Sequence, residues 1–266
     1  MGKSSENLKI ALIGAGNLAT NLGLALSRAG HNIVCVYSRT SLSASTLAGK
    51  LGCSWTTNLS QLISKTEDFD LVILSVKDSV LTELANQFPL NSPTLFLHTA
   101  GSMPQDCLPM KHRGVLYPMQ TFSKEREADF RHIPTFLEVA CEEDKPLLQT
   151  VTESITDNIY WLSSDRRKSL HLAAVFTCNF ANYCYDVASQ LLEQDDIPFS
   201  VMLPLIEETT RKLHQLTPYE AQTGPAVRYD TNVIERHLKM LDSMPDKQSL
   251  YETLTQMIHQ RHQGQA

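Results

Sequence analysis

Short apolar runs and amphipathic helical stretches alternate along the chain as far as residue 162. Leu18, Leu22 and Leu26, for example, recur at helical spacing on one face, and Gly30 follows where that helix would end. This alternation predicts helices that cover a mostly parallel sheet, because parallel strands need crossover connections. The predicted strands are residues 8–13, 32–37, 53–57, 71–76, 94–98, 114–117, 135–140 and 158–162.

From Ser164 onward the strand pattern stops and only helical periodicity remains. One long helix is predicted, followed by three shorter helices that prolines separate. The long helix should bury an apolar stripe formed by Leu172, Val175, Phe176, Phe180, Val187 and Leu191. The predicted helices are residues 165–195, 199–216, 232–244 and 250–262. We therefore expect an α/β domain over residues 1–163 and an all-helical domain over residues 164–266.

The composition and net charge of the chain indicate which kinds of molecule it binds. Hydrophobic residues make up 42% of the chain and charged residues 20%, a balance typical of a protein that buries a core. A formal net charge of -6 argues against nucleic acids and anionic membranes, and no apolar stretch approaches the roughly 20 residues of a membrane-spanning helix. The start of the chain carries no targeting signal, and the six cysteines form no Cys-x-x-Cys pair. We expect a cytoplasmic protein with reduced thiols, a small-molecule substrate and no metal.

The strongest local signal is a glycine motif that follows the first predicted strand and opens the first helix. Gly14 permits a tight turn, Gly16 lets a pyrophosphate approach the backbone, and Ala19 lets the helix pack closely on the strand. The helix N-terminus offers free N–H groups and a positive dipole to phosphate. An ordinary glycine turn is the alternative, but the strand, helix and second strand in succession favour a Rossmann-type dinucleotide site. Its pyrophosphate contacts would be Gly14, Gly16, Asn17 and Leu18.

The end of the second strand bears on the choice of cofactor. An NAD-binding domain places an acidic residue there for the ribose hydroxyls, whereas this chain has Ser38 and Arg39. A guanidinium binds phosphate through paired hydrogen bonds, so Ser38 and Arg39 fit the 2′-phosphate of NADP. A solvated loop arginine is the alternative, but the missing acidic residue favours NADP.

Polar and small residues also follow the later strands, at the carboxyl ends where open α/β sheets bind ligands. His98 ends the fifth strand, where it serves either as a proton donor or as a hydrogen-bonded structural residue. The segment from Tyr117 to Phe122 forms a third edge, which is either a ligand contact or a plain exit from a strand. We expect Val76, Lys77 and Thr99 beside the nicotinamide, and Gly101 and Gln120 beside the substrate.

The long helix carries polar residues on or beside its apolar stripe. His171 and Asn179 lie about two helical turns apart. They are either core residues that join helices or residues that face the nicotinamide, with His171 as acid or base and Asn179 positioning the substrate. Lys168, one turn before His171, is a rival proton donor, although Arg166 and Arg167 beside it also fit a solvated basic first turn.

A Gly-Pro break interrupts the helical half of the chain. Thr223 precedes Gly224-Pro225, and Arg228 and Asp230 follow within the same segment. The break exposes backbone groups, and Arg228 would bind an anionic group of the substrate or the cofactor. An ion pair between Arg228 and Asp230 that only closes the loop is the alternative. We include Thr223, Arg228 and Asp230 among the candidate substrate contacts.

Together these blocks resemble a family of NADP oxidoreductases in the 6-phosphogluconate-dehydrogenase-like group, in which a Rossmann-like domain precedes a helical domain of unknown function. The matching blocks are residues 14–19, 98–102, 118–122, 171–179 and 223–230, so the resemblance covers nearly the whole chain. The family is similar to pyrroline-5-carboxylate reductase, ketopantoate reductase and the deazaflavin-dependent NADP reductases. The resemblance implies hydride transfer between NADP(H) and a small carbonyl or imine compound. It also implies a homodimer, because the helical domain commonly dimerises in this superfamily.

The chain departs from the family pattern at three positions. Tyr117 stands where the resemblance leads us to expect His before the Pro of the third block, which counts against a proton-relay role for that strand end. Tyr229 replaces a small residue in the last block. Leu172 occupies the Asn position of the Lys-x-x-His-Asn motif of 6-phosphogluconate dehydrogenase, although Lys168 and His171 match it, so that enzyme's substrate is not expected.

The hypothesis that follows is an NADP-dependent dehydrogenase or reductase. The helical domain would supply the substrate side, with His171 and Asn179 acting on the substrate heteroatom and Arg228 recognising charge. Two alternatives remain: a non-catalytic NADP-binding sensor and a deazaflavin-dependent NADP reductase. A sensor needs no acid or base beside the nicotinamide, so the position of His171 and Asn179 relative to the strand ends bears on the choice.

Overall fold

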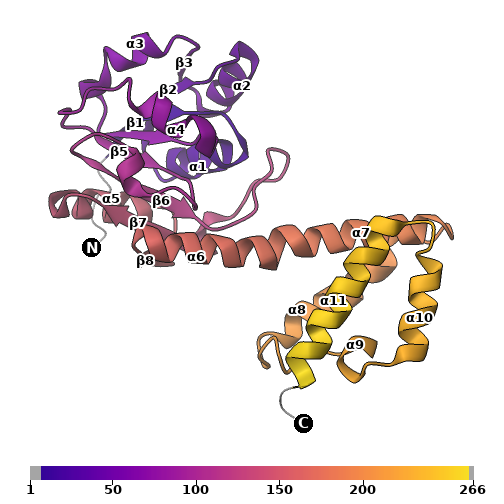
Figure 1. Cartoon of the computed structure of the whole chain (residues 1–266). Coiled ribbons are helices and arrows are strands. Elements are labelled where there is room, and N and C mark those ends of the chain that lie inside the picture. Colours follow the sequence, from indigo (N-terminus) through magenta and orange to yellow (C-terminus); the bar gives the residue numbers. More distant parts are fainter. Residues whose placement is uncertain (1–6, 264–266) are drawn as a thin grey trace. The chain divides into compact units, whose positions relative to one another are not determined.

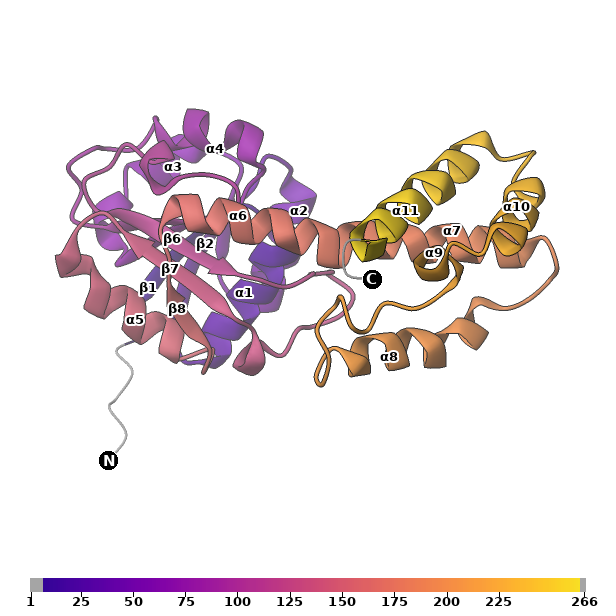
Figure 2. The ribbon, with the colours of Figure 1, turned by 60° about the horizontal axis from the view of Figure 1, so that its bottom comes forward.

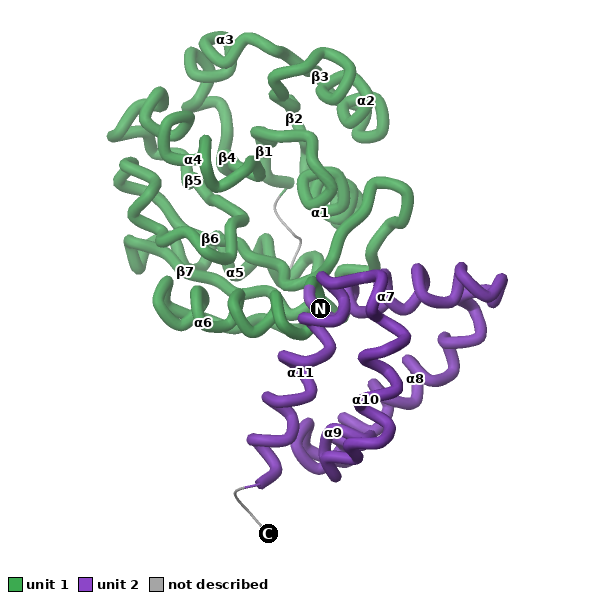
Figure 3. Tube along the Cα trace, turned by 45° about the vertical axis from the view of Figure 1, so that its right-hand side comes forward, with its two compact units in different colours: residues 1–179 green, residues 180–266 purple. Residues whose placement is uncertain are grey.

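A computed structural model describes residues 7–263 and divides the chain into two compact units, residues 1–179 (unit 1) and residues 180–266 (unit 2) (Figure 3). Regular strands end before Ser164, where α6 (Ser164–Ala174) begins. This helix belongs to unit 1, because its first turn is hydrogen-bonded to the sheet and to the segment after β5. The boundary between the two compact units therefore lies between residues 179 and 180. The change from strands to helices lies between residues 163 and 164, where the sequence predicted the domain boundary.

Unit 1 is built on an eight-stranded sheet in the order β3-β2-β1-β4-β5-β6-β7-β8 (Figures 1 and 2). All neighbouring strands are parallel except β6 and β7, which are antiparallel. The strands are β1 (Lys9–Ile13), β2 (Asn32–Tyr37), β3 (Ser54–Thr56), β4 (Leu71–Leu74), β5 (Leu95–His98), β6 (Arg113–Pro118), β7 (Thr135–Val139) and β8 (Ile159–Trp161). Each lies at a predicted position, and the predicted α/β fold with a mostly parallel sheet is confirmed.

Both faces of this sheet are covered, because alternate side chains of each strand enter different buried clusters. In β1, Ile10 and Leu12 belong to one cluster and Ala11 and Ile13 to the other. The first cluster takes side chains from α1 (Asn17–Arg28), α2 (Ser41–Leu51) and α5 (Lys145–Glu153). The second takes them from α3 (Leu59–Ile63) and α4 (Asp78–Ala85). Short 3-10 helices are Thr66–Asp68, Gln105–Cys107, Phe130–His132 and Glu142–Asp144.

The strand order places a crevice at the carboxyl ends of β1 and β4. From β1 the chain moves outward to β2 and β3, and then returns to the other side of β1 at β4. The connections after β1 and β4 therefore leave in opposite directions. Ligands of open α/β sheets bind at such a switch point.

The predicted long helix is present in three segments. Helix α6 continues through a π-helical segment (Val175–Phe180) into α7 (Ala181–Glu193). The expectation that its apolar stripe is buried is wrong for several members, since Leu172, Phe176 and Phe180 are 60%, 62% and 51% exposed. Helical spacing shows which side chains share a face, but not whether the same chain covers that face.

Unit 2 contains α7 and four further helices, which are coloured orange to yellow in Figure 1. They are α8 (Leu203–Lys212), which follows a 3-10 turn (Phe199–Met202), α9 (Pro225–Arg228), α10 (Thr231–Met240) and α11 (Pro245–Gln263). Of its described residues, only Ala226, Leu241 and Thr255 are buried. Among residues 7–263, no helix combines the length and the apolar character needed to cross a membrane.

Candidate functional site

The turn between β1 and α1 is shaped for a phosphate group. Gly14 has φ of +115°, and a Cβ there would lie 2.1 Å from the carbonyl oxygen of Ser75, so only glycine fits. A Cβ on Gly16 would meet no atom within 4 Å, which leaves space in front of α1. No side chain caps the N-terminus of this helix. The first N–H groups of α1 therefore face a space that suits a pyrophosphate.

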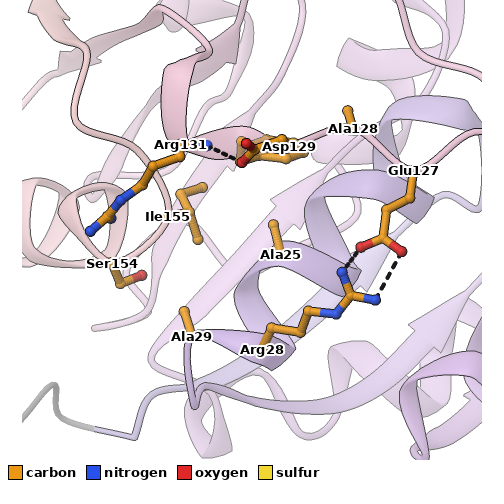
Figure 4. Close-up of a pocket in the computed structure, with 10 residues that line it drawn as sticks. Ala25, Arg28, Ala29, Glu127, Ala128, Asp129, Arg131, Ser154 and Ile155 are labelled. Atoms are coloured by element: carbon orange, nitrogen blue, oxygen red, sulfur yellow. Dashed lines mark hydrogen bonds and ion pairs between the residues drawn. The ribbon is translucent and has the colours of Figure 1, made fainter.

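Two asparagines tie the segment after β6 to α1. The side chain of Asn17 donates to the carbonyl of Phe122 at 2.8 Å, and that of Asn21 donates to the carbonyl of Ser123 at 2.9 Å. An ion pair between Arg28 and Glu127 fastens the same segment further along, beside a separate cavity (Figure 4). The side-chain amide of Asn17, a predicted cofactor contact, is thus engaged with this segment, while its backbone N–H belongs to the first turn of α1.

One cavity of about 600 Å³ brings the predicted cofactor residues together within unit 1. Its lining includes Gly14, Gly16, Asn17, Leu18, Ser38, Arg39, Val76, Lys77 and Thr99. Gly101 and His171 also line it, as do Thr40 and Ser43, whose hydroxyls are 2.9 Å apart. Arg39 is exposed and makes no ion pair with any residue between 7 and 263. The guanidinium and hydroxyl groups fit a 2′-phosphate, and the glycine turn fits the pyrophosphate. Ser43 was missed by the sequence analysis, although it lies only four residues after Arg39.

His98 occupies a structural position. It is fully buried, Nε2 lies 3.2 Å from the carbonyl of Pro104, and Nδ1 accepts the N–H of Ala100 at 3.2 Å. Burial, reinforced by the nearby Arg167 guanidinium, lowers the pKa of His98 from 6.5 to about 4. The ring is therefore neutral near pH 7 with its proton on Nε2, and it holds the turn after β5.

Arg167 anchors the same turn from the other side. Its side chain is completely buried and pairs with Glu138 of β7, and Nη2 donates to the carbonyl of Met103 at 2.6 Å. The hydroxyl of Ser164 donates to Glu138 at 2.7 Å and accepts the N–H of Gln105 at 3.0 Å. This network joins α6 to β7 and to the segment after β5. The alternative of a solvated basic first turn is wrong for Arg167.

Tyr117, Gly101 and His171 meet at the edge of the cavity. The hydroxyl of Tyr117 lies 3.1 Å from Nδ1 of His171, and the two rings pack edge to face with centroids 6.1 Å apart. A Cβ on Gly101 would lie 2.6 Å from Nδ1 of His171 and 2.8 Å from Cζ of Tyr117. Glycine is therefore required beside this pair. Tyr117 was predicted only as the start of a strand-exit segment, and its contact with His171 was missed, because no local pattern shows that a strand end faces a helix 54 residues later.

A second cavity, of about 530 Å³, lies against the first half of the long helix. It is lined by the segment after β6, including Gln120, and by residues of α6 and the π-helical segment, including Asn179. Tyr117 and His171 line both cavities. The His171 imidazole therefore borders both the cavity that contains the predicted cofactor residues and the second cavity, which is not lined by any Asp, Glu, Lys or Arg. Lys168 is exposed, pairs with Asp165 at 3.4 Å and lines neither cavity.

The remaining predicted residues belong to unit 2. Asp230 caps α10 by accepting the N–H of Val233, and Tyr229 has φ of 50° at the end of α9. Thr223 and Arg228 are exposed, and Arg228 forms no ion pair with Asp230. The loop-closing ion pair that was the alternative for this segment is therefore not formed.

Within the described part of the chain, one group of side chains gathers possible metal ligands. The ligand atoms of His112, Cys141 and Glu143 lie within 4.8 Å of one another. Nδ1 of His112 is 3.0 Å from Asp144, and Glu143 is 3.3 Å from the ammonium of Lys111. His112 and Glu143 thus have protein partners, and the cluster lies outside the two cavities that contain the predicted site residues.

The sheet topology, the glycine turn and the first cavity define a Rossmann-type dinucleotide-binding protein. The family model for NADP oxidoreductases dependent on coenzyme F420 matches residues 9–98, and a domain of unknown function (DUF2520) matches residues 133–258. Curated protein sequences contain no match. A protein of known structure from Bacteroides fragilis, described provisionally as an NADP oxidoreductase, is 48% identical, with a TM-score of 0.88 over 97% of this chain and 100% of its own. The chain belongs to this family of NADP oxidoreductases.

More distant structures share the fold. A protein from Thermotoga maritima is 20% identical, with a TM-score of 0.77 over 96% of this chain and 100% of its own. A reductive aminase from Aspergillus terreus, solved with NADPH and ethyl-5-oxohexanoate, is 15% identical, with a TM-score of 0.62 over 94% of this chain and 88% of its own.

Proposed function

We propose that the protein transfers a hydride between NADP(H) and a small carbonyl or imine compound, with His171 acting on the heteroatom of that compound. The observation that carries this proposal is that His171 lines both the cavity that contains the predicted cofactor residues and the second cavity beside α6. A group that exchanges a proton with the substrate must lie within hydrogen-bond reach of the substrate heteroatom, while the substrate carbon lies beside the nicotinamide. His171 is also the group that a mere nucleotide sensor would not need.

The cofactor supplies or accepts the hydride when it is bound, and the protein binds and orients it. In this proposal the backbone of Gly14, Gly16, Asn17 and Leu18 holds the pyrophosphate, and Ser38 and Arg39 hold the 2′-phosphate. Val76, Lys77 and Thr99 border the nicotinamide end of the same cavity. His98 takes no part in proton transfer, because both of its ring nitrogens are engaged and the ring is fully buried.

The substrate would occupy the second cavity, beside Gln120 and Asn179, with Gly101 on the side of the first cavity. No Asp, Glu, Lys or Arg lines this cavity. An isolated carboxylate is costly to bury without a counter-charge, so these walls suit an uncharged part of the substrate. Recognition of an anionic group is assigned to Arg228, with Thr223 and Asp230 beside it in the chain.

Replacing Arg39 with Gln should weaken NADPH binding and leave NADH binding nearly unchanged. The lost hydrogen bonds to the 2′-phosphate are worth about 1.5–3 kcal/mol, which corresponds to an increase of about 10-fold to 100-fold in the dissociation constant. Fluorescence titration of both cofactors measures the effect. Arg28→Gln is the matched control, since Arg28 is also an exposed arginine but pairs with Glu127 outside this cavity. An equal loss for NADPH and NADH would contradict the assignment of Arg39.

The reaction itself is tested by following NADPH consumption with a panel of small keto compounds, each offered as a free acid and as its ester, with and without an amine. Turnover of any compound in the panel would establish hydride transfer. A preference for the free acids over their esters would show that the protein recognises a carboxylate. Tight NADPH binding without turnover of any compound would instead favour a sensor. Turnover only when coenzyme F420 is added would identify the deazaflavin-dependent reaction.

We also propose a homodimer formed through unit 2, which has few buried side chains of its own. Leu205 is 63% exposed and Met240 is 74% exposed, and such apolar area is usually covered in an assembly. Light scattering should give twice the mass of one chain. Leu205→Asp should lower that mass toward a single chain, whereas Leu90→Asp, which changes an exposed leucine of unit 1, should not. A wild-type monomer would overturn the proposal.

The cytoplasm is the compartment we assign to the protein. All six cysteines are free thiols, and several are partly buried. Unpaired cysteines are typical of reducing compartments.

A further inference from the structure

The hydroxyl of Tyr117 is the only protein group that hydrogen-bonds the His171 ring among the described residues. Its distance of 3.1 Å is to Nδ1, and no bond to Nε2 is made within residues 7–263. Nε2 is therefore the nitrogen that remains for a ligand. The direction of the hydrogen bond between Tyr117 and Nδ1 therefore decides which nitrogen of the neutral ring carries the proton.

The hydroxyl keeps its own proton, and Nδ1 of His171 is the only protein acceptor that this proton meets among the described residues. Tyr117 is only 8% exposed, and this burial raises the pKa of its hydroxyl above 10, more than the Arg167 guanidinium lowers it. A protonated hydroxyl that donates to Nδ1 requires an unprotonated nitrogen there. In the neutral ring the proton then lies on Nε2.

Packing fixes both rings in this arrangement. Tyr117 packs against Phe136 with ring centroids 6.3 Å apart, and Phe136 stacks on Tyr160 at 5.3 Å. On the other side, Gly101 lies so close to Tyr117 and His171 that even a Cβ would overlap with them. The phenol therefore has little freedom to turn away from the imidazole.

We propose that Tyr117 is a positioning residue that holds neutral His171 with its proton on Nε2, facing the ligand. An N–H in that place donates to the oxygen of a carbonyl or the nitrogen of an imine, and it stabilises the negative charge that develops there as hydride arrives. The resting enzyme is thereby set for reduction of the substrate. This role rests on the hydride-transfer function proposed above.

Nitrogen NMR of the protein labelled with ¹⁵N-histidine reads the protonation of each ring nitrogen directly. His171→Gln identifies the signals of His171 by their loss. His98 serves as an internal reference, because its bonds fix the proton on Nε2. The wild-type His171 ring should show the same pattern as His98, with Nδ1 unprotonated. A proton on Nδ1 of neutral His171 would overturn the proposal without any variant of Tyr117.

Tyr117→Phe removes the hydroxyl and keeps the ring. The two nitrogen signals of His171 should then move toward each other as the ring exchanges between its two neutral forms, and kcat should fall about 10-fold to 100-fold with an unchanged KM for NADPH. Tyr160→Phe is the matched control, since Tyr160 contacts the same Phe136 but not His171. An unchanged His171 spectrum in Tyr117→Phe would contradict the proposal. The spectra need no substrate, so a failure of hydride transfer in the panel would remain distinguishable from a failure of this assignment.

Discussion

His171→Gln should lower kcat by a factor of about 10² to 10⁴, the usual contribution of a positioned acid or base. The dissociation constant of NADPH should remain within about a factor of two, because the phosphate contacts assigned to the glycine turn and to Arg39 are untouched. His171 is only partly buried, so the folded state should tolerate the change. NADPH consumption with the compound found in the panel, together with a cofactor titration, measures both quantities.

Lys168→Gln is the control for this prediction. Lys168 lies one turn earlier on α6, is exposed and pairs with Asp165 at 3.4 Å. It was the rival proton donor in the sequence, so the two variants decide between them. Loss of activity in Lys168→Gln with full activity in His171→Gln would reverse the assignment.

Glu138→Ala should cause the largest loss of stability, about 3–5 kcal/mol, because it leaves the buried Arg167 guanidinium without its counter-charge. Arg167 is completely buried and Glu138 is 14% exposed, so water cannot replace the carboxylate without rearrangement. The effect should reach the site as well, since this ion pair anchors the turn that contains Gly101. Urea unfolding measures the change in free energy.

Two further variants separate the ion pair from a general effect of charge. Glu142→Ala removes a carboxylate that is 81% exposed from the surface pair with Lys145, and such a pair contributes about 1 kcal/mol at most. The double variant Glu138→Leu with Arg167→Met should recover much of the lost stability, because apolar side chains replace both charges. A loss below about 1 kcal/mol in Glu138→Ala would show that Arg167 is not held as described.

The sequence predicted best what depends on neighbouring residues. The tight turn at Gly14 and the open space at Gly16 follow from the glycine motif, and the place of Arg39 in the first cavity follows from its position at the end of a strand, whereas their contacts with the cofactor stay predictions. The strands were placed within a few residues, because alternate apolar positions and parallel crossovers leave strong periodic signals.

Contacts between residues far apart in the sequence could not be predicted from the periodicity of apolar and polar residues. The bond between Tyr117 and His171 depends on how α6 crosses the end of β6, and the burial of Arg167 depends on Glu138 of β7. Arg167 stands among charged residues, from Asp165 to Lys168, where exposure is the ordinary expectation. Phe176 was predicted to be buried but is exposed, because helical spacing shows which side chains share a face and not what covers that face.

Thermal unfolding with NADPH, with NADH and without ligand tests most directly whether unit 1 binds NADP(H) as described. A cofactor present at about 100 times its dissociation constant adds about 2.7 kcal/mol to the free energy of unfolding, which raises Tm by roughly 5 to 11 °C for a chain of this size. We expect this shift with NADPH and a clearly smaller one with NADH at the same concentration. No shift with NADPH would contradict the assignment of the glycine turn and Arg39, and with it the proposed reaction.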